Sequence, residues 1–215
     1  MEKDKISIII PVVRIAGAKR CIASIERNAG IPPEDYEIVT EIDHDRIGCP
    51  KMVKKLVEKT KYDFVCFLGD DTEIEEDCLK IALETMAKLP DGWGLTGLND
   101  NFHDGNSKAT HWLGSKQLLP LLGGEFFHTG YVHCRCDKEL TNRAKKLKRY
   151  IWAIDAKLKH NHPAIKGVPR EEWDNDYKKA YLEENVLADN ALFASRERQE
   201  KRKNFNWAKL LPEDK

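Results

Sequence analysis

The 215-residue sequence has no excess of either charge, because 36 lysines and arginines balance 36 aspartates and glutamates. A neutral chain has no global field that would draw it to nucleic acid or to an anionic membrane, although local basic patches remain open. The apolar run near the start, ISIIIPVV, is too short to span a bilayer, and a signal-peptide order of basic, apolar and small-residue regions is missing. We therefore expect a cytoplasmic protein without a transmembrane segment.

The six cysteines form no C-x-x-C pair. Cys66 lies within an expected core strand, so reduced thiols fit better than a disulfide framework. Cys134 and Cys136 are separated by one residue, with His128 and His133 nearby, and zinc binding is a weak alternative there because no second matching pair exists.

Glycine is also scarce where a phosphate loop would need it. The segment VVRIAGAKR, after the first expected strand, contains a single glycine. A nucleotidyltransferase on a similar sheet would carry a glycine-rich loop with nearby Arg or Lys at this place. The match to that class is therefore poor.

Strands and helices alternate through the first half of the chain. The β-branched run ISIIIPVV is typical of a strand buried on both faces of a parallel sheet. Apolar residues then recur at helical spacing between such strands. The expected strands are 6–13, 36–42 and 63–68, and the expected helices are 18–28, 52–59 and 75–89. This alternation predicts an α/β sheet with helices on both faces.

The pattern changes after residue 92. Short strand candidates are separated by Gly, Asn and Asp, which indicates a mixed continuation of the same sheet within a single domain, 1–195. The strand candidates are 93–98, 111–115, 126–132 and 151–158, with a helix at 138–150.

The C-terminal segment, 196–215, is basic and includes Phe205, Trp207, Leu210 and Leu211. We expect a helical tail that packs on the body or, in a homodimer, on a second subunit. Membrane or nucleic-acid binding by this tail is the weaker alternative, because basic helices with a few aromatic residues are common on ordinary surfaces.

The stretch FVCFLGDDTEI runs from a buried strand directly into two carboxylates, Asp70 and Asp71. In open α/β sheets ligands bind beyond the carboxyl ends of the strands, which favours a functional role for this pair. The alternative is that Asp71 and Thr72 only cap a helix that begins near Glu75.

Two histidines, His160 and His162, follow the strand expected at 151–158. In an extended segment their i, i+2 spacing points both imidazoles to one face. Carboxylate oxygen, with an imidazole, suits a divalent cation such as Mg²⁺ or Mn²⁺ that also binds substrate phosphates. Two unconnected surface histidines are the alternative.

The order of these segments resembles that of the nucleotide-sugar glycosyltransferases with the GT-A fold, closest to the family 2 type. The segments are IIIPVV, YEIVTEID, FVCFLGDDTEI, CDKEL and the His-rich turn, and the resemblance covers roughly 6–167. LGDDTEI looks like the variant family motif L-N-x-D-T-E. The resemblance implies a GT-A (Rossmann-like) mixed sheet, with a nucleotide-binding half at 1–98 and an acceptor half at 99–195.

For the metal, the resemblance implies that Asp71 binds the Mn²⁺ or Mg²⁺ that bridges the two phosphates of the donor. Asp70 would contact the ribose or the waters on the metal. Gly69 stands where the commoner motif has its first Asp. We therefore expect His160 or His162 to complete the metal site, and metal independence is the alternative.

For the nucleotide, Pro11 and Arg14 match the loop that holds the base and ribose. Glu41 and Asp43 straddle the acidic position that reads the base edge, and the resemblance does not decide between them. Lys51 falls where the family often has a basic residue near the nucleotide, with a solvated helix-start lysine as the alternative.

For catalysis, Asp137 matches the general base in the signature E-D-x-D-L-x-x-R. Glu139 matches the later acid, whereas Cys136 replaces the usual Glu. The alternative is that Asp137 only caps a helix. The resemblance implies an inverting, hexosyltransferase-like enzyme that uses a nucleoside-diphosphate sugar, with a UDP-sugar favoured, and an acceptor hydroxyl on a glycan, a lipid-linked molecule or modified nucleic acid.

Aromatic and imidazole side chains in the second half indicate the region that meets the acceptor, although core packing explains many of them equally well. They are His111, Trp112, Phe126, Phe127, His128, Tyr131 and His133. Asp174, Asp176 and Tyr177 lie in a polar stretch that we expect to form a lid over the donor.

Two other functions stay open. The basic stretches KKLKR and RERQEKRK favour a viral-type transferase that glycosylates a modified nucleic-acid base. The departures at Gly69 and Cys136 favour a non-catalytic module that binds a nucleotide sugar without turnover.

Overall fold

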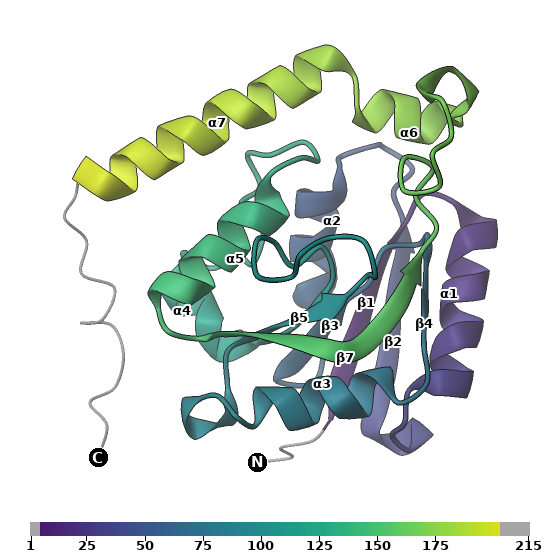
Figure 1. Ribbon diagram of the computed structural model, residues 1–215, viewed down its shortest axis with the longest axis vertical. Helices are drawn as coiled ribbons and strands as arrows, with labels where there is room; N and C mark the ends of the chain where they lie inside the picture. Colours follow the sequence, from purple (N-terminus) through teal and green to yellow (C-terminus); the bar gives the residue numbers. More distant parts are fainter. Residues whose placement is uncertain (1–4, 203–215) are drawn as a thin grey trace.

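The computed structural model describes residues 5–202 and contains one seven-stranded sheet between layers of helices (Figure 1). The strands lie in the order β2-β1-β3-β6-β5-β7-β4. They are β1 (Ile6–Val12), β2 (Tyr36–Ile42), β3 (Phe64–Phe67), β4 (Thr72–Ile74), β5 (Leu95–Asn99), β6 (Trp112–Ser115) and β7 (Tyr150–His160). The expected α/β sheet with a mixed second half is confirmed.

Helices cover both faces of this sheet. They are α1 (Ile15–Asn28), α2 (Cys49–Val57), α3 (Cys78–Met86), α4 (Leu119–Leu122), α5 (Cys136–Lys146), α6 (Asn175–Ala180) and α7 (Glu183–Arg202). Short 3₁₀ turns occur at Pro33–Asp35, Pro90–Gly92, Lys116–Leu118 and Arg170–Glu172. Within residues 5–202, the helices are too short or too polar to span a bilayer.

Side chains of β1 alternate between two cores, as expected for a strand covered on both faces. Ile8 and Ile10 are fully buried in a cluster with α1 and α3. Ile9 is fully buried in a second cluster with α2, α4 and α5. The β-branched run therefore stabilises both layers at once.

The strand directions bring several polar chain segments to one edge of the sheet. β1, β2 and β3 are parallel, with Ile9 opposite both Val39 and Phe67. β6 is antiparallel to β3 and to β5, and β7 is parallel to β5. β1, β2, β3, β5 and β7 therefore all end at the edge where β6 begins.

The strand expected at 126–132 was wrong. This segment forms bends and turns. Phe126 and Phe127 are buried against Trp112, with ring centroids 4.6 and 5.7 Å from its ring. The apolar residues of this segment are buried in the core. A buried loop gives the same apolar pattern as a buried strand, so the pattern alone did not separate the two.

The alternative that Asp71 and Thr72 only cap a helix is wrong. Thr72 begins β4 and lies opposite His160 in an antiparallel pair with β7. Its hydroxyl donates to the carbonyl of Gly69 at 2.8 Å. The helix starts later, after Asp77 in a left-handed conformation (φ 57°). Neither Asp71 nor Thr72 caps it, so Asp71 has another role.

Two buried carboxylates hold α7 on the body. Asp189, on α7, accepts hydrogen bonds from three successive backbone N–H groups, 132–134, at 2.6–2.9 Å. Glu139, on α5, accepts from Nε and Nη2 of Arg196 at 2.9 and 2.6 Å. The helix therefore fixes the loop that leads into α5.

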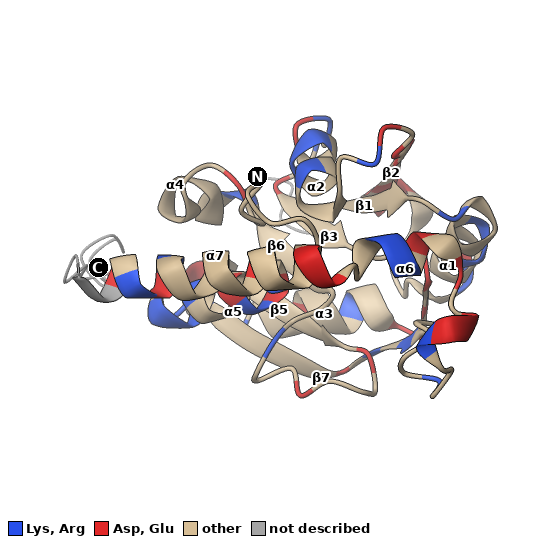
Figure 2. Ribbon diagram, turned by 90° about the horizontal axis from the view of Figure 1, so that it is seen from above, with Lys and Arg blue, Asp and Glu red and all other residues tan. Residues whose placement is uncertain are grey.

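Part of the expected C-terminal tail is thus seen to pack on the body. An ion pair between Lys146 and Glu200 adds to this contact. Acidic residues begin α7, and charges of both signs alternate near its end (Figure 2). Residues 203–215, which contain the four apolar residues of the tail, lie outside the described residues, so a homodimer through them stays a prediction.

Arg196→Met tests the α7 contact. The substitution keeps the apolar stem but removes one of the two arginine partners of Glu139, which is only 7% exposed, and leaves Arg143 3.8 Å away. We expect the free energy of unfolding to fall by about 2 kcal/mol, measured by urea denaturation. Arg198→Met, at an exposed position of the same helix, should change it by less than about 0.5 kcal/mol. Equal losses in the two variants would contradict the contact.

Candidate active site

Polar side chains gather at the edge where β1, β2, β3, β5 and β7 end and β6 begins. Because the strands share this edge, residues far apart in the sequence become neighbours. They border a cavity of about 940 Å³ or lie directly behind its wall. The residues at the strand ends are Arg14, Asp43, Asp70, Asp71, Asp100, His111 and His160.

Asp70 anchors the loop after β1. Its Oδ2 accepts hydrogen bonds from the backbone N–H groups of Val13 and Arg14 at 2.7 and 2.6 Å. Its Oδ1 accepts from the guanidinium of Arg14, and only 3% of Asp70 is exposed. Asp70 therefore sets the position of Arg14 on the cavity wall, and its expected contact with the ribose or with metal-bound water stays a prediction.

Asp71 lies at the centre of the polar group. Its Oδ2 accepts a hydrogen bond from the Tyr177 hydroxyl at 2.5 Å and lies 3.7 Å from Nε2 of His160. The ring of Tyr177, on α6, also stacks 3.9 Å from the Arg14 guanidinium carbon. Tyr177 belongs to the segment that we expect to form a lid. This segment therefore contacts Asp71, the carboxylate that the sequence predicts as a metal ligand.

Gly69 leaves space that two neighbouring side chains use. A Cβ at this position would lie 2.7 Å from Oδ1 of Asp71 and 3.3 Å from Nε2 of His111. His111 directly precedes β6 and is 3% exposed. An imidazole therefore occupies the region where the commoner motif would have its first acid.

Asp71, His111 and His160 offer one carboxylate oxygen and two imidazole nitrogens within 4.8 Å of one another. This mixed set fits Mn²⁺ better than Mg²⁺, which prefers oxygen ligands, and it leaves coordination positions open for phosphate. Burial lowers the pKa of His111 to about 3, so this imidazole is neutral and has a free lone pair. The residues therefore fit a divalent cation.

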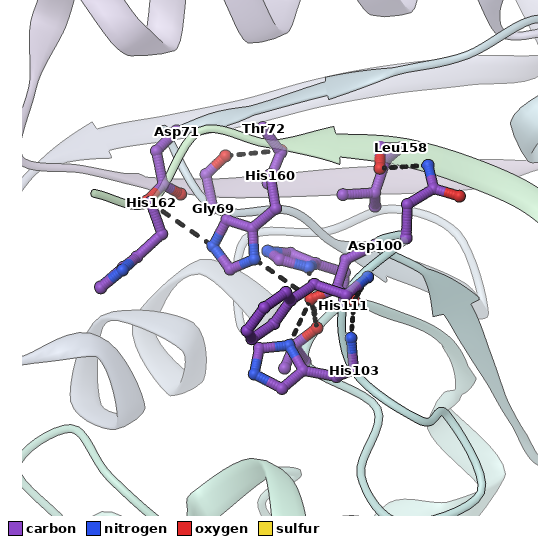
Figure 3. A network of polar contacts seen from close by, with 12 residues as sticks. Gly69, Asp71, Thr72, Asp100, His103, His111, Leu158, His160 and His162 are labelled. Carbon is purple, nitrogen blue, oxygen red and sulfur yellow. Dashed lines mark hydrogen bonds and ion pairs between the residues drawn. The ribbon is translucent and has the colours of Figure 1, made fainter. Parts of the chain in front are cut away.

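The charge on His160 is set by two carboxylates (Figure 3). Burial alone would lower its pKa, but Asp100 and Asp71 raise the pKa of His160 to about 9. Burial likewise opposes ionisation of Asp71, yet His160, Arg14 and Tyr177 together hold the pKa of Asp71 well below its ordinary value. A cation at this site has to displace the His160 proton.

His162, the other histidine expected as a ligand, does not join this group. Its Nδ1 accepts a hydrogen bond from the backbone N–H of Ala164 at 3.1 Å, and its ring packs on Tyr177 and Tyr181. Burial lowers its pKa to about 4. Of the two histidines, only His160 lies beside Asp71 within the groups of possible metal ligands among residues 5–202.

The residues expected to bind the nucleotide separate into two sets. Pro11 and Asp43 line the cavity together with Arg14. Asp43 also accepts from the backbone N–H groups of 47–48, which shapes the loop before α2. Glu41 lies in ion pairs with two lysines, and Lys51 is exposed on α2; neither is on the cavity wall. The structure therefore favours Asp43 over Glu41.

Asp137 lies in the first turn of α5 and lines the same cavity. Its Oδ1 accepts from the backbone N–H of Lys138 at 2.7 Å, and its Oδ2 lies 3.8 Å from Nζ of Lys108. The side chain is 20% exposed, so a ligand in the cavity can reach it. Glu139 instead binds Arg196 outside the cavity.

The weak alternative of a zinc site at Cys134 and Cys136 finds no support. Within residues 5–202, the groups of close metal ligands contain no cysteine. The Cys136 thiol donates to the carbonyl of His133 at 3.3 Å, and burial raises the pKa of Cys134 to about 11. Burial also raises the pKa of Cys136, so both thiols are protonated at neutral pH and are poor metal ligands. All six cysteines are free thiols.

No protein-family model and no curated protein matches this sequence. Solved structures do match its fold. Residues 1–349 of TarS from S. aureus share 15% identity with it over 75% of this chain and 62% of that chain, with a TM-score of 0.58. The complex of TarS 1–349 with UDP-GlcNAc has 14% identity over 69% and 55%, with a TM-score of 0.54.

A mannosyltransferase from Pyrobaculum calidifontis, PcManGT, in complex with GDP-Man and Mn²⁺, has 14% identity over 89% of this chain and 64% of that chain, with a TM-score of 0.63. The chain has the GT-A glycosyltransferase fold. It spans less than two thirds of the length of each of these solved chains. At these identities the likeness concerns the fold alone.

Gly69→Ala tests the space at the polar centre. The added methyl would meet Asp71 and His111, and overpacking of this kind costs about 1–3 kcal/mol. We expect a lower free energy of unfolding together with weaker Mn²⁺ binding, measured by calorimetric titration. Unchanged Mn²⁺ affinity would mean that the space at residue 69 is not needed for the site.

The raised pKa of His160 predicts how the metal-free protein responds to pH. Its folded pKa of about 9 lies above the ordinary value of about 6.5. The stabilisation is therefore complete below pH about 6.5 and is lost as the pH rises through about 9. In the presence of a chelator, urea unfolding should show stability falling across this window, and His160→Gln should flatten the slope. A slope equal to that of the wild type would contradict the prediction.

Proposed function

We propose that the chain is an inverting, metal-assisted glycosyltransferase that moves a sugar from a nucleoside-diphosphate sugar to an acceptor hydroxyl. The observation that carries this proposal is the group Asp71, His111 and His160 on the same cavity as Asp137, in a chain with the GT-A fold. The group would hold the cation, and Asp137 would act as the general base.

The donor is proposed to lie along the ends of β1, β2 and β3, within the nucleotide-binding half at 1–98. Pro11, Arg14 and Asp43 line this part of the cavity. The Arg14 guanidinium carries a fixed positive charge that suits a diphosphate. UDP stays the favoured nucleotide from the sequence, and solved structures of the same fold were determined with UDP-GlcNAc and with GDP-Man and Mn²⁺.

Asp71 would hold a divalent cation through its carboxylate, and His111 and His160 through imidazole nitrogens. The cation would supply neutralisation of the negative charge that develops on the departing diphosphate. For this His160 would have to release its proton. The Tyr177 hydroxyl binds only Oδ2 of Asp71, so Oδ1 stays open to the cation without movement of α6.

Asp137 is proposed to take the proton of the acceptor hydroxyl while its oxygen attacks the anomeric carbon. One C–O bond forms as the bond to the diphosphate breaks, and the leaving group departs from the opposite face. A single displacement of this kind inverts the anomeric configuration. The cavity gives Asp137 access to the acceptor, and the proton then resides on its carboxylate.

The acceptor half, 99–195, offers fewer free aromatic faces than its sequence indicates. Trp112, Phe127 and Tyr131 are at most 2% exposed and belong to the core. His133 lies on the cavity wall with Tyr181, with ring centroids 4.9 Å apart. We propose that these two rings, rather than the buried ones, meet the acceptor.

The alternative acceptor, a modified nucleic-acid base, receives little support. Arg149 of KKLKR is 2% exposed and stacks on Trp93. Lys146 pairs with Glu200, and Arg196 of the second basic stretch pairs with Glu139. These three residues of the two basic stretches contact protein groups, which reduces the positive charge that the stretches offer to a nucleic acid. A cytoplasmic location stays a prediction.

The proposal is tested first by nucleotide binding. Thermal unfolding should be measured with UDP and GDP, each with and without Mn²⁺, because a ligand that binds only the folded state raises its melting temperature. We expect a larger shift with Mn²⁺. A shift that does not depend on the metal would remove the proposed role of Asp71.

Asp137→Asn tests the base. Transfer or slow hydrolysis of the nucleotide sugar should fall by about 10²–10⁴-fold, while the nucleotide-induced thermal shift is kept. Asp155→Asn, at an exposed position of β7, is the matched control and should keep full activity. Turnover that survives Asp137→Asn would overturn the assignment, and absence of turnover in the wild type with an intact thermal shift would favour the non-catalytic module.

A further inference from the structure

Asp100 is a buried carboxylate that does not line the cavity and has no role in the proposed transfer step. It follows β5, is 4% exposed, and lies behind the polar group described above (Figure 3). Its Oδ1 accepts hydrogen bonds from the backbone N–H groups of 102–103 at 3.2 and 2.8 Å. Its Oδ2 faces side chains of the site.

Three side chains meet Oδ2 of Asp100. They are Nδ1 of His103 at 2.6 Å, Oγ1 of Thr110 at 3.0 Å and Nδ1 of His160 at 3.2 Å. An ionised carboxylate only accepts hydrogen bonds, so each of these partners has to donate. His160 therefore carries a proton on Nδ1, and its Nε2 is the atom that faces Asp71.

Thr110 links Asp100 to the second imidazole, that of His111. The hydroxyl of Thr110 has one proton, which it donates to Asp100. Its oxygen also lies 3.2 Å from Nδ1 of His111, so it can only accept there. His111 therefore carries its proton on Nδ1, and the lone pair of its Nε2 points toward the space at Gly69 and Asp71.

We infer that Asp100 is a positioning residue that sets the orientation of both imidazole ligands, His160 directly and His111 through Thr110. The role of Asp100 toward a cation rests on the proposed function. The positions of the protons on the two imidazoles rest only on the hydrogen bonds. One carboxylate directs two Nε2 atoms toward Asp71. Partners of this kind behind metal ligands typically change metal affinity by about 10–100-fold when removed.

The arrangement also accounts for the position of Asp100 in the fold. Because β5 and β7 are parallel and end at the same edge, Asp100 lies beside His160. Because β6 is antiparallel to β5 and begins at that edge, Thr110 and His111 lie on its other side. A residue after β5 is thus placed between the two segments that carry the imidazoles.

The first test compares Asp100→Asn with Asp104→Asn. The new amide has one oxygen, which cannot serve both the backbone of 102–103 and the three side-chain donors. We expect Mn²⁺ affinity, measured by calorimetric titration or by the EPR signal of free Mn²⁺, to fall about 10–100-fold. Asp104 is exposed on the same loop and caps the N–H of Asn106, so Asp104→Asn should bind Mn²⁺ like the wild type. Equal affinity in both variants would overturn the inference.

The second test needs no metal, nucleotide or sugar. Side-chain ¹⁵N NMR of the wild type should place the His111 proton on Nδ1, and Thr110→Val, which removes the hydroxyl acceptor there, should move it to Nε2. A proton on Nε2 of His111 in the wild type would overturn the inference even if Asp100→Asn fails to fold.

The two tests separate this inference from the proposed function. If the His111 proton is on Nδ1 and Mn²⁺ binds as expected but no sugar is transferred, the proposed function fails and the positioning role stands. If sugar is transferred while Asp100→Asn keeps the Mn²⁺ affinity of the wild type, the positioning role fails alone. Absence of Mn²⁺ binding in the wild type would contradict the positioning role and the metal assistance together.

Discussion

The shared carboxyl edge of the sheet is the constraint on which the site depends. Parallel strands end on the same side, so a polar residue after each of β1, β3, β5 and β7 has to meet the others there. The antiparallel β6 adds its first residues to the same edge. Buried polar groups need partners, and at this edge each strand end supplies partners for the next. The directions of the strands therefore determine where the site lies, and the individual residues determine its chemistry.

Charge balance at this edge explains why the polar group is compatible with burial. Two buried carboxylates, Asp71 and Asp100, share the protonated His160 between them, and Asp70 pairs with Arg14. Removing one partner from such a group leaves an uncompensated charge, which is far more costly than the pair itself. The imidazolium also gives the metal-free protein a way to keep the two carboxylates ionised. In the proposed function the His160 proton and the cation would be alternatives at one position.

The fold and half of the site follow from local patterns, and the other half does not. Continuous β-branched runs and helical spacing identify β1, β2 and β3 with the helices that follow them, and strand ends identify Asp70 and Asp71. His111 and Asp100 were not predicted as residues of the proposed metal site, because they reach it only through the pairing of β6 with β3 and β5 and of β7 with β5. Asp100 lies among Asn and Asp residues that indicate a turn, and the turn is real, since Oδ1 caps 102–103. The one signal in the sequence for His111 was its position directly before the short apolar strand β6.

Gly69 shows why a missing side chain can be an informative residue. The commoner motif places an acid there, and its absence by itself indicates a weakened metal site. In this fold the same volume is used by His111, which approaches from β6 and which a Cβ at residue 69 would crowd. A side chain at 69 would therefore clash with Oδ1 of Asp71 and crowd the imidazole of His111. Compared with the commoner motif, this chain has glycine in place of the acid and a nearby histidine. A charged oxygen ligand is thereby exchanged for a neutral nitrogen. In the proposed metal site, that exchange would favour Mn²⁺ over Mg²⁺.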